Sequence, residues 1–241
     1  MAPRFSVVIP AYNEARLLPR LLDSLARARD AYGQADSIEI IVADNLSTDA
    51  TAEIARAHAC TVASVEKRVI GAVRNGGAAI ARGEILCFVD ADSQVHVSTF
   101  LAIDAALASG RCVGGATGAT MERWSAGIAL TYATLVPMVW ITAMDTGVVF
   151  CRREDFQAIG GYDESRLVAE DVMFLVALRR LGRNRGQKLM RLRTSKVIGS
   201  TRKFDEFGDW HYFGLMWQGA RHLLRRGDHA FTDRYWYKPR R

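Results

Sequence analysis

The chain has 241 residues, of which 49% are hydrophobic and 24% charged, so its composition excludes a wholly disordered chain and suits a folded globular protein. The net charge of +6 is uneven, because residues 179–241 carry 17 Lys/Arg against 5 Asp/Glu. No nucleic-acid-binding motif accompanies this basic end, so we expect no nucleic-acid partner. The four cysteines show no metal-binding spacing and predict buried free thiols.

The N-terminal half alternates between two kinds of apolar pattern. Short β-branched runs predict strands, and leucines or alanines at helical spacing predict helices. In chain order we expect a strand at Phe5–Pro10, a helix at Ala15–Ala31, a strand at Ile38–Asp44, a helix at Ala50–Ala59, a strand at Thr61–Val65, a glycine-rich loop at Gly71–Gly77, a helix at Ala78–Arg82 and a strand at Glu84–Val89. This order predicts a parallel sheet with helical crossovers.

Three of these strands end on groups that suit a ligand site. They are followed by the segment Pro10–Glu14, by Asp44, and by Asp90 with Asp92. Carboxyl ends of parallel strands share one edge of the sheet, where ligands bind. Two aspartates one residue apart can hold a hard cation that carries a diphosphate, although aspartates are also common in plain turns. Dinucleotide and P-loop glycine motifs are absent, which disfavours those two classes.

Two later segments carry further signals. Glu170 and Asp171 precede the apolar periodicity of Val172–Leu181, so they either favour the helix dipole or supply a catalytic base. From Trp124 to Met144 no side chain is charged, over nearly the length of a membrane span. Because Pro137 and three threonines interrupt this run, we expect a buried or acceptor-facing helix pair rather than a transmembrane helix.

Taken together, the segments resemble family 2 glycosyltransferases with the GT-A fold. The likeness runs from about Phe5 to Gly182, in the order and spacing of that family. It rests on Val7–Glu14, Asp44–Asp49, Ala72–Gly77, Asp90–Asp92, Gly160–Asp163 and Glu170–Asp171. The resemblance implies an α/β fold with a mainly parallel central sheet flanked by helices, followed by a helical C-terminal extension.

It also implies a division of the chain and a reaction. Residues 1–182 would form the GT-A domain, with a nucleotide-binding half at about 1–95 and an acceptor-binding half at about 96–182. Residues 183–241 would form a basic, aromatic extension. The implied enzyme moves one sugar from a UDP- or GDP-linked donor to an acceptor hydroxyl, with inversion and with Mn²⁺ or Mg²⁺ as cofactor.

The resemblance assigns roles to particular side chains. The expected nucleotide-sugar contacts are Pro10, Ala11, Tyr12, Glu14, Asp44, Arg74, Asn75, Asp90, Ala91, Asp92, Arg202 and Lys203. Asp92 and Asp90 would bind the metal, with His211 as a third ligand or a packed histidine. Asp171 would act as base and Glu170 would orient the acceptor, next to Gly160 and Gly161.

Departures from the family pattern keep alternatives open. Leu46 stands where the family usually has glycine or asparagine, and the arginine-tryptophan motif of polymerising synthases is absent, which favours a single transfer. A retaining transferase, a nucleotidyltransferase and a degenerate nucleotide-binding module remain alternatives. The acceptor is a glycan, a lipid or a small molecule. We expect a cytoplasmic protein, since no secretory signal precedes the first strand, and leave open a homodimer and peripheral contact with the inner face of the membrane.

Overall fold

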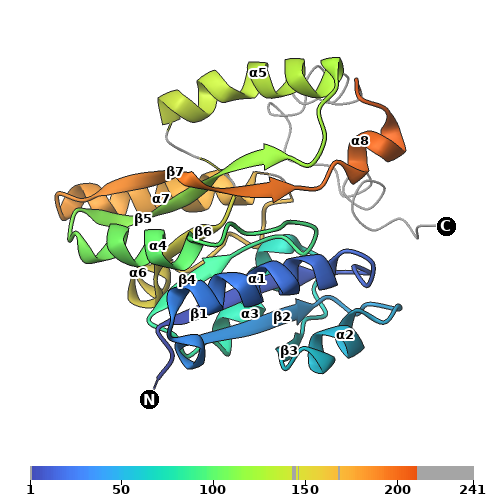
Figure 1. Ribbon diagram of the computed structural model, residues 1–241. Helices are drawn as coiled ribbons and strands as arrows, with labels where there is room; N and C mark the ends of the chain where they lie inside the picture. Colours follow the sequence, from blue (N-terminus) through green and yellow to red (C-terminus); the bar gives the residue numbers. More distant parts are fainter. Residues whose placement is uncertain (1, 143–144, 146, 168, 211–241) are drawn as a thin grey trace.

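The computed structural model describes residues 2–142, 145, 147–167 and 169–210. Within them a seven-stranded sheet with the order β3-β2-β1-β4-β6-β5-β7 forms the centre of the molecule (Figure 1). The strands are β1 (Phe5–Ala11), β2 (Ile38–Asp44), β3 (Thr61–Ser64), β4 (Ile85–Phe88), β5 (Cys112–Met121), β6 (Val149–Arg152) and β7 (Lys188–Gly199). Strand β6 is antiparallel to both of its neighbours, while the other adjacent pairs are parallel. The expected mainly parallel sheet is therefore confirmed.

Helices cover both faces of the sheet. The helices are α1 (Leu18–Tyr32), α2 (Thr51–Ala57), α3 (Ile70–Ala79), α4 (Thr99–Ala108), α5 (Ala126–Thr142), α6 (Arg153–Ala158), α7 (Glu170–Asn184) and α8 (Arg202–Phe207), with a 3₁₀ turn at Ala35–Ser37. One core joins α1 and α4 to the sheet through residues such as Leu21, Phe100 and Ile103. The other core packs α3 and α7 against the opposite face around Phe88. Alternate strand residues serve the two cores, as Val7 and Val8 do in β1.

The glycine-rich segment is helical, so our prediction of a loop at Gly71–Gly77 is wrong. Helix α3 spans Ile70–Ala79, and the predicted helix at Ala78–Arg82 is its end and the turn beyond it. Its glycines allow close packing: a Cβ on Gly77 would lie 2.5 Å from Val8 Cγ1, and one on Gly76 would lie 2.5 Å from Val65 Cγ2. Glycine was interpreted as a sign of a loop, whereas here it brings the helix against the sheet.

The second half of the sheet comes from segments for which the sequence suggested no strands. Strand β7 lies in the predicted extension but forms the edge of the central sheet beside β5. In the described part of the uncharged run, residues 126–142 form one helix, α5, in place of the expected pair. Among the described residues, no helix has both the length and the apolar character needed to cross a membrane.

In the part of the chain that the structure describes, four non-glycine residues have a left-handed backbone, and three of them lie in loops around one end of the sheet. Asn13 (φ 54°) follows β1, Leu46 (φ 58°) follows β2, and Ala169 (φ 59°) precedes α7. The first two loops interlock, because the Asn13 amide donates to Ser47 Oγ at 3.0 Å and Asn13 Oδ1 accepts from the Thr48 amide at 2.8 Å. Strained backbone of this kind often marks functional sites.

The strain at Leu46 predicts a stabilising substitution. Its side chain is 44% exposed, and an L-residue in this conformation costs about 1–2 kcal/mol. Asparagine tolerates the left-handed region, so Leu46→Asn should raise the free energy of unfolding by about 0.5–1 kcal/mol and Tm by about 1–4 °C. Thermal unfolding followed by circular dichroism measures the change. Leu101→Asn, at a similarly exposed leucine in helix α4, is the control and should give no gain. Equal effects of the two substitutions would rule out strain as the cause.

Candidate active site

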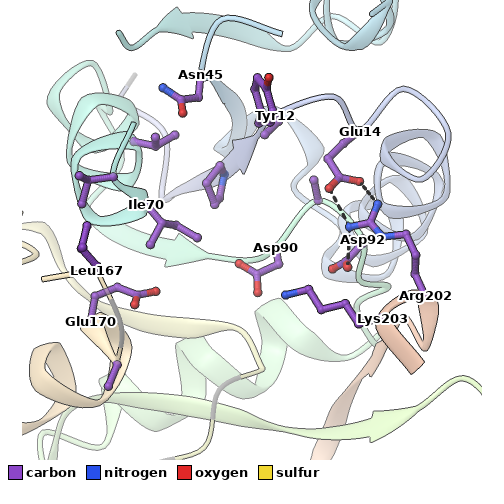
Figure 2. Close-up of a pocket in the computed structure, with 16 residues that line it drawn as sticks. Tyr12, Glu14, Asn45, Ile70, Asp90, Asp92, Leu167, Glu170, Arg202 and Lys203 are labelled. Atoms are coloured by element: carbon purple, nitrogen blue, oxygen red, sulfur yellow. Dashed lines mark hydrogen bonds and ion pairs between the residues drawn. The ribbon is translucent and has the colours of Figure 1, made fainter. Parts of the chain in front are cut away.

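A pocket opens at the carboxyl ends of β1 and β4, where the loops after the strands meet α3, α7 and α8 (Figure 2). The lining residues are Pro10, Ala11, Tyr12, Glu14, Asn45, Val69, Ile70, Val73, Asp90, Ala91, Asp92, Leu167, Ala169, Glu170, Arg202 and Lys203. Nine of them come from the residues that we expected to bind a nucleotide-sugar, and Glu170 is the tenth predicted site residue in the lining. Residues up to 193 positions apart in the sequence, Pro10 and Lys203, therefore meet at the edge of the sheet where ligands bind in parallel folds.

One wall of the pocket is largely apolar. It combines Pro10 and Tyr12 after β1 with Val69, Ile70 and Val73 at the start of α3. The Arg68 guanidinium carbon lies 5.6 Å from the centroid of the Tyr12 ring, which keeps this ring beside a cation. Sequence reasoning missed Val69, Ile70 and Val73, because no helix was expected to begin here and present one face to the pocket.

Asp44 and Asn45 end strand β2 side by side but differ in exposure to the pocket. Asn45 lines it, and its amide group donates to the Val65 carbonyl at 2.6 Å. Asp44 is buried and absent from the lining; its Oδ2 accepts weakly from the Ser47 amide at 3.3 Å, while Oδ1 has no partner. Contact between Asp44 and a nucleotide stays a prediction.

Helix α8 brings two basic residues to the opposite wall. Arg202 forms a fork with Glu14, at 2.7 and 2.9 Å, and lies 3.4 Å from Asp92 Oδ2. The side chain of Lys203 points toward Asp90 and Asp92 (Figure 2). Burial, together with repulsion from Asp90, raises the pKa of Asp92 to about 6, against the opposing effect of Arg202. These contacts link a C-terminal helix to the first and fourth strands.

Arg74 lies behind the pocket in a cluster of three carboxylates. Its guanidinium is 4% exposed and donates to Glu170 and Asp171 at 2.7 Å each and to Asp90 at 2.9 Å. Burial alone would lower the pKa of Arg74, but the carboxylates outweigh it and the pKa is raised. Arg74 is absent from the pocket lining, so direct contact with a nucleotide stays a prediction.

The acidic pair at the start of α7 is divided between the pocket and the interior. Glu170 lines the pocket, whereas Asp171 lies beside Arg74 and Tyr162 and is not among the lining residues. Burial raises the pKa of Asp171 to about 7; the negative charges of Glu170 and Asp90 act in the same direction and Arg74 opposes them. A carboxyl group with this pKa exchanges protons readily near neutral pH, which is the property required of a general base.

Gly160 and Gly161 form a left-handed turn (φ 80° and 72°) outside the pocket lining. A Cβ on Gly161 would lie 2.7 Å from Asn75 Oδ1, so this position requires glycine. Asn75 itself is absent from the lining and hydrogen-bonds the turn. Binding of an acceptor by the two glycines, and of a nucleotide by Asn75, stay predictions.

The residues at the pocket fit a divalent cation that is shared with a diphosphate. Asp90 and Asp92 supply carboxylate oxygens, and Mg²⁺ is commonly held by one or two carboxylates together with phosphate oxygens and water. Burial raises the pKa of Asp92, and the negative charges of Asp90 and Glu14 act in the same direction, so a bound cation would be favoured there. In the described part of the chain no group of three or more His, Cys, Asp or Glu residues could hold a metal alone. His211, the suggested third ligand, lies outside the described residues.

Comparisons with known sequences give a family match. The family model "Glycosyl transferase family 2" matches residues 6–125. A validoxylamine A glucosyltransferase from Streptomyces hygroscopicus subsp. jinggangensis is 38% identical over 94 residues, which cover 36% of this chain and 22% of that enzyme. A putative glycosyltransferase, EpsH of Bacillus subtilis, is 34% identical over 99 residues, covering 39% and 27%. The matches thus span about a quarter of the length of these relatives.

Comparisons with solved structures give the same fold over most of the chain. Staphylococcus aureus TarS 1–349 superposes with a TM-score of 0.63 at 19% identity, covering 95% of this chain and 68% of that one. The mannosyltransferase PcManGT of Pyrobaculum calidifontis, in complex with GDP-Man and Mn²⁺, gives 0.64 at 22% identity, with coverage of 82% and 57%. Glucosyl-3-phosphoglycerate synthase of Mycobacterium tuberculosis, in complex with Mn²⁺, UDP and glucosyl-3-phosphoglycerate, gives a TM-score of 0.60 at 21% identity, with coverage of 86% and 75%.

These likenesses confirm the expected fold and the expected family. The architecture is that of the GT-A glycosyltransferases, with a mainly parallel sheet covered by helices on both faces. The match of the family model over residues 6–125, about half of the chain, shows that the chain belongs to glycosyl transferase family 2.

Proposed function

We propose that the protein transfers a sugar from a nucleoside-diphosphate-sugar to an acceptor hydroxyl, in a single transfer that depends on a divalent cation. The observation that carries the proposal is one pocket that combines an apolar wall, the Asp90–Asp92 pair, two basic side chains and the Glu170 carboxylate. Relatives named as glycosyltransferases and the GT-A fold support the reaction class. UDP or GDP is the expected carrier, because solved neighbours are complexes with UDP-GlcNAc and with GDP-Man.

The donor would lie across the pocket from Tyr12 to α8. The base and ribose suit the apolar wall around Pro10, Tyr12 and Val73, where a ring can pack against a ring. The diphosphate would lie near Asp90 and Asp92, with Arg202 and Lys203 as charge partners. For this contact Arg202 must exchange part of its pairing with Glu14 and Asp92 for phosphate oxygens.

Mn²⁺ or Mg²⁺ bound at Asp90 and Asp92 would neutralise the charge that develops on the departing diphosphate. The Asp171 carboxylate takes the proton of the acceptor hydroxyl while that oxygen forms its bond to the anomeric carbon. The bond from this carbon to the diphosphate oxygen breaks, and its electron pair leaves with the nucleoside diphosphate. Attack from the side opposite the leaving group inverts the anomeric configuration. Glu170, which reaches the pocket, would orient the acceptor.

The proposal also covers the acceptor, the location of the enzyme in the cell and its oligomeric state. A glycan, a lipid or a small molecule each offers the hydroxyl that the reaction needs, and the uncharged residues 124–144 together with the basic tail favour a lipid. The same features support peripheral contact with a membrane surface, in a cytoplasmic protein. A homodimer is a further proposal that oligomeric-state measurements would test.

The reaction class predicts release of a nucleoside diphosphate with inversion. The protein should release UDP or GDP from one member of a panel of UDP-glucose, UDP-GlcNAc, UDP-galactose and GDP-mannose, with Mn²⁺ or Mg²⁺, and EDTA should abolish the release. NMR of the glycosylated product should show the anomeric configuration opposite to that of the donor. Retention would refute Asp171 as the base of a direct displacement. Release of pyrophosphate from nucleoside triphosphates would instead indicate a nucleotidyltransferase.

The acidic pair predicts different kinetic effects for its two members. Asp171→Asn should lower kcat about 10²–10⁴-fold, the usual contribution of a general base, with little change in the donor KM. Glu170→Gln is the matched variant next to it and should mainly raise the acceptor KM. The reverse pattern, with kcat lost only in Glu170→Gln, would transfer the base role to Glu170.

The raised pKa of Asp171 also predicts a pH profile. Only the carboxylate form accepts a proton, so kcat/KM, which reports the pKa values of the free enzyme, should rise between pH 6 and 8 with a midpoint near 7. The charged and titratable groups that act on Asp171 are Arg74, Glu170, Asp90 and Tyr162. Residual activity of Asp171→Asn should lack this rise. A rise that persists unchanged in this variant would contradict the assignment.

A further inference from the structure

Arg74 and Asn75 are consecutive on helix α3, yet both lie outside the pocket that the sequence expected them to line. Arg74 is 4% exposed, and its two terminal nitrogens already bind three carboxylates. A phosphate oxygen would have to displace one of these partners to reach the guanidinium. Arg74 therefore lacks the accessible, unoccupied donors that a binding site for a phosphate group needs.

The contacts of Arg74 join two parts of the chain. Nη2 binds Asp90, which follows strand β4 and faces the pocket with a 52% exposed side chain. Nη1 binds both Glu170 and Asp171, at the start of α7. A planar guanidinium offers its donors in fixed directions, so it determines how far apart these acceptors lie. One group thus sets the distance between the expected donor side and the expected base side.

An aromatic stack supports the guanidinium from the other side. The Tyr162 ring lies 5.2 Å from the Arg74 guanidinium carbon and stacks on Phe174 of α7, with centroids 4.3 Å apart and planes 13° apart. Tyr162 is 2% exposed, and its hydroxyl has no hydrogen-bond partner. Tyr162 therefore supports the Arg74 guanidinium through the face of its ring and not through its hydroxyl.

Asn75 fixes the backbone that carries this ring. Its Nδ2 donates to the Tyr162 carbonyl and its Oδ1 accepts from the Tyr162 amide, both at 2.9 Å. The same Nδ2 donates to Glu164 at 3.0 Å. Both backbone groups of Tyr162 are thus held by the residue next to Arg74. The two neighbours on α3 position one structural unit together.

We propose that Arg74 and Asn75 form a positioning pair. The pair holds Asp90, Glu170 and Asp171 at the distances from one another that the reaction needs, without contacting the donor. Arg74 brings the three carboxylates together and offsets their mutual repulsion, and Asn75 holds the ring on which Arg74 rests. The inference rests on the proposed glycosyl transfer, because the relative positions of these carboxylates matter for activity only if all three take part in one reaction. It reassigns both residues from nucleotide binding to organisation of the site.

The test separates binding from turnover. For Arg74→Lys we expect kcat for donor hydrolysis or transfer to fall about 100-fold, the cost typical of a displacement of about 1 Å in an active site. Lysine keeps the charge but cannot reach three carboxylates in fixed directions. The Kd of UDP or GDP, measured by calorimetry with Mn²⁺, should change less than about 3-fold, since 1.4 kcal/mol of lost contact would already cost tenfold.

Arg4→Lys is the matched control. Arg4 also bridges two carboxylates from separate elements, Glu84 and Asp104, but it lies at the start of β1, at the opposite end of the strand from the pocket. Its substitution should leave kcat and the nucleotide Kd unchanged. Unchanged kcat in Arg74→Lys, or a loss of nucleotide affinity of tenfold or more, would overturn the proposal. The second result would restore Arg74 as a nucleotide ligand.

Two further variants test the proposal in case Arg74→Lys does not fold. Asn75→Ser removes the contacts to Tyr162 but no charge, and it should lower kcat at unchanged nucleotide Kd. In Arg74→Ala, millimolar guanidinium should restore part of kcat, whereas ammonium at equal ionic strength should not. Equal behaviour of the two salts, or wild-type kcat in Asn75→Ser, would contradict the proposal. Failure of the proposed function is distinguishable, because the wild-type protein itself would then neither bind nor turn over any nucleotide-sugar.

Discussion

The arrangement of the pocket depends on a single buried cation facing three carboxylates. Arg74 donates to Asp90, Glu170 and Asp171 from a site that is almost closed to solvent. Three like charges would not remain so close without it, since unpaired buried charges are strongly unfavourable. Burial, together with the negative charges of Glu170 and Asp90, raises the pKa of Asp171 against the opposing effect of Arg74. One ion-pair network thus fixes the spacing of the acidic groups and the protonation of the proposed base.

The sheet explains why such distant residues converge. Strands β1, β2 and β4 are adjacent and parallel, so the segments that follow them lie at one edge. Left-handed residues at Asn13, Leu46 and Ala169 turn the loops around this edge. Helix α8 then approaches from the far end of the described chain, and Arg202 pairs with Glu14 and Asp92 (Figure 2). A binding site for a charged donor would therefore arise from short loops on a rigid scaffold.

Sequence reasoning could predict the features that depend on local pattern. Apolar periodicity identified the first four strands, and Asp90, Asp92 and Glu170 were identified by their place after a strand or before a helix. It failed where tertiary contacts decide. Glycines in α3 indicated a loop because their close contacts with Val8 and Val65 are invisible in the sequence. Strand β7 pairs with β5 residues 75–78 positions earlier in the sequence, and the burial of Arg74 depends on carboxylates almost 100 residues away.

The central claim, that the pocket binds a nucleoside diphosphate through a divalent cation, is tested most directly by calorimetric titration. UDP and GDP would each be titrated into the protein with Mn²⁺ and, separately, with EDTA. We predict that one of the two nucleotides binds in the presence of Mn²⁺ and that EDTA weakens this binding at least tenfold, about 1.4 kcal/mol. Absence of binding by both nucleotides to folded protein, or binding that EDTA leaves unchanged, would contradict the account.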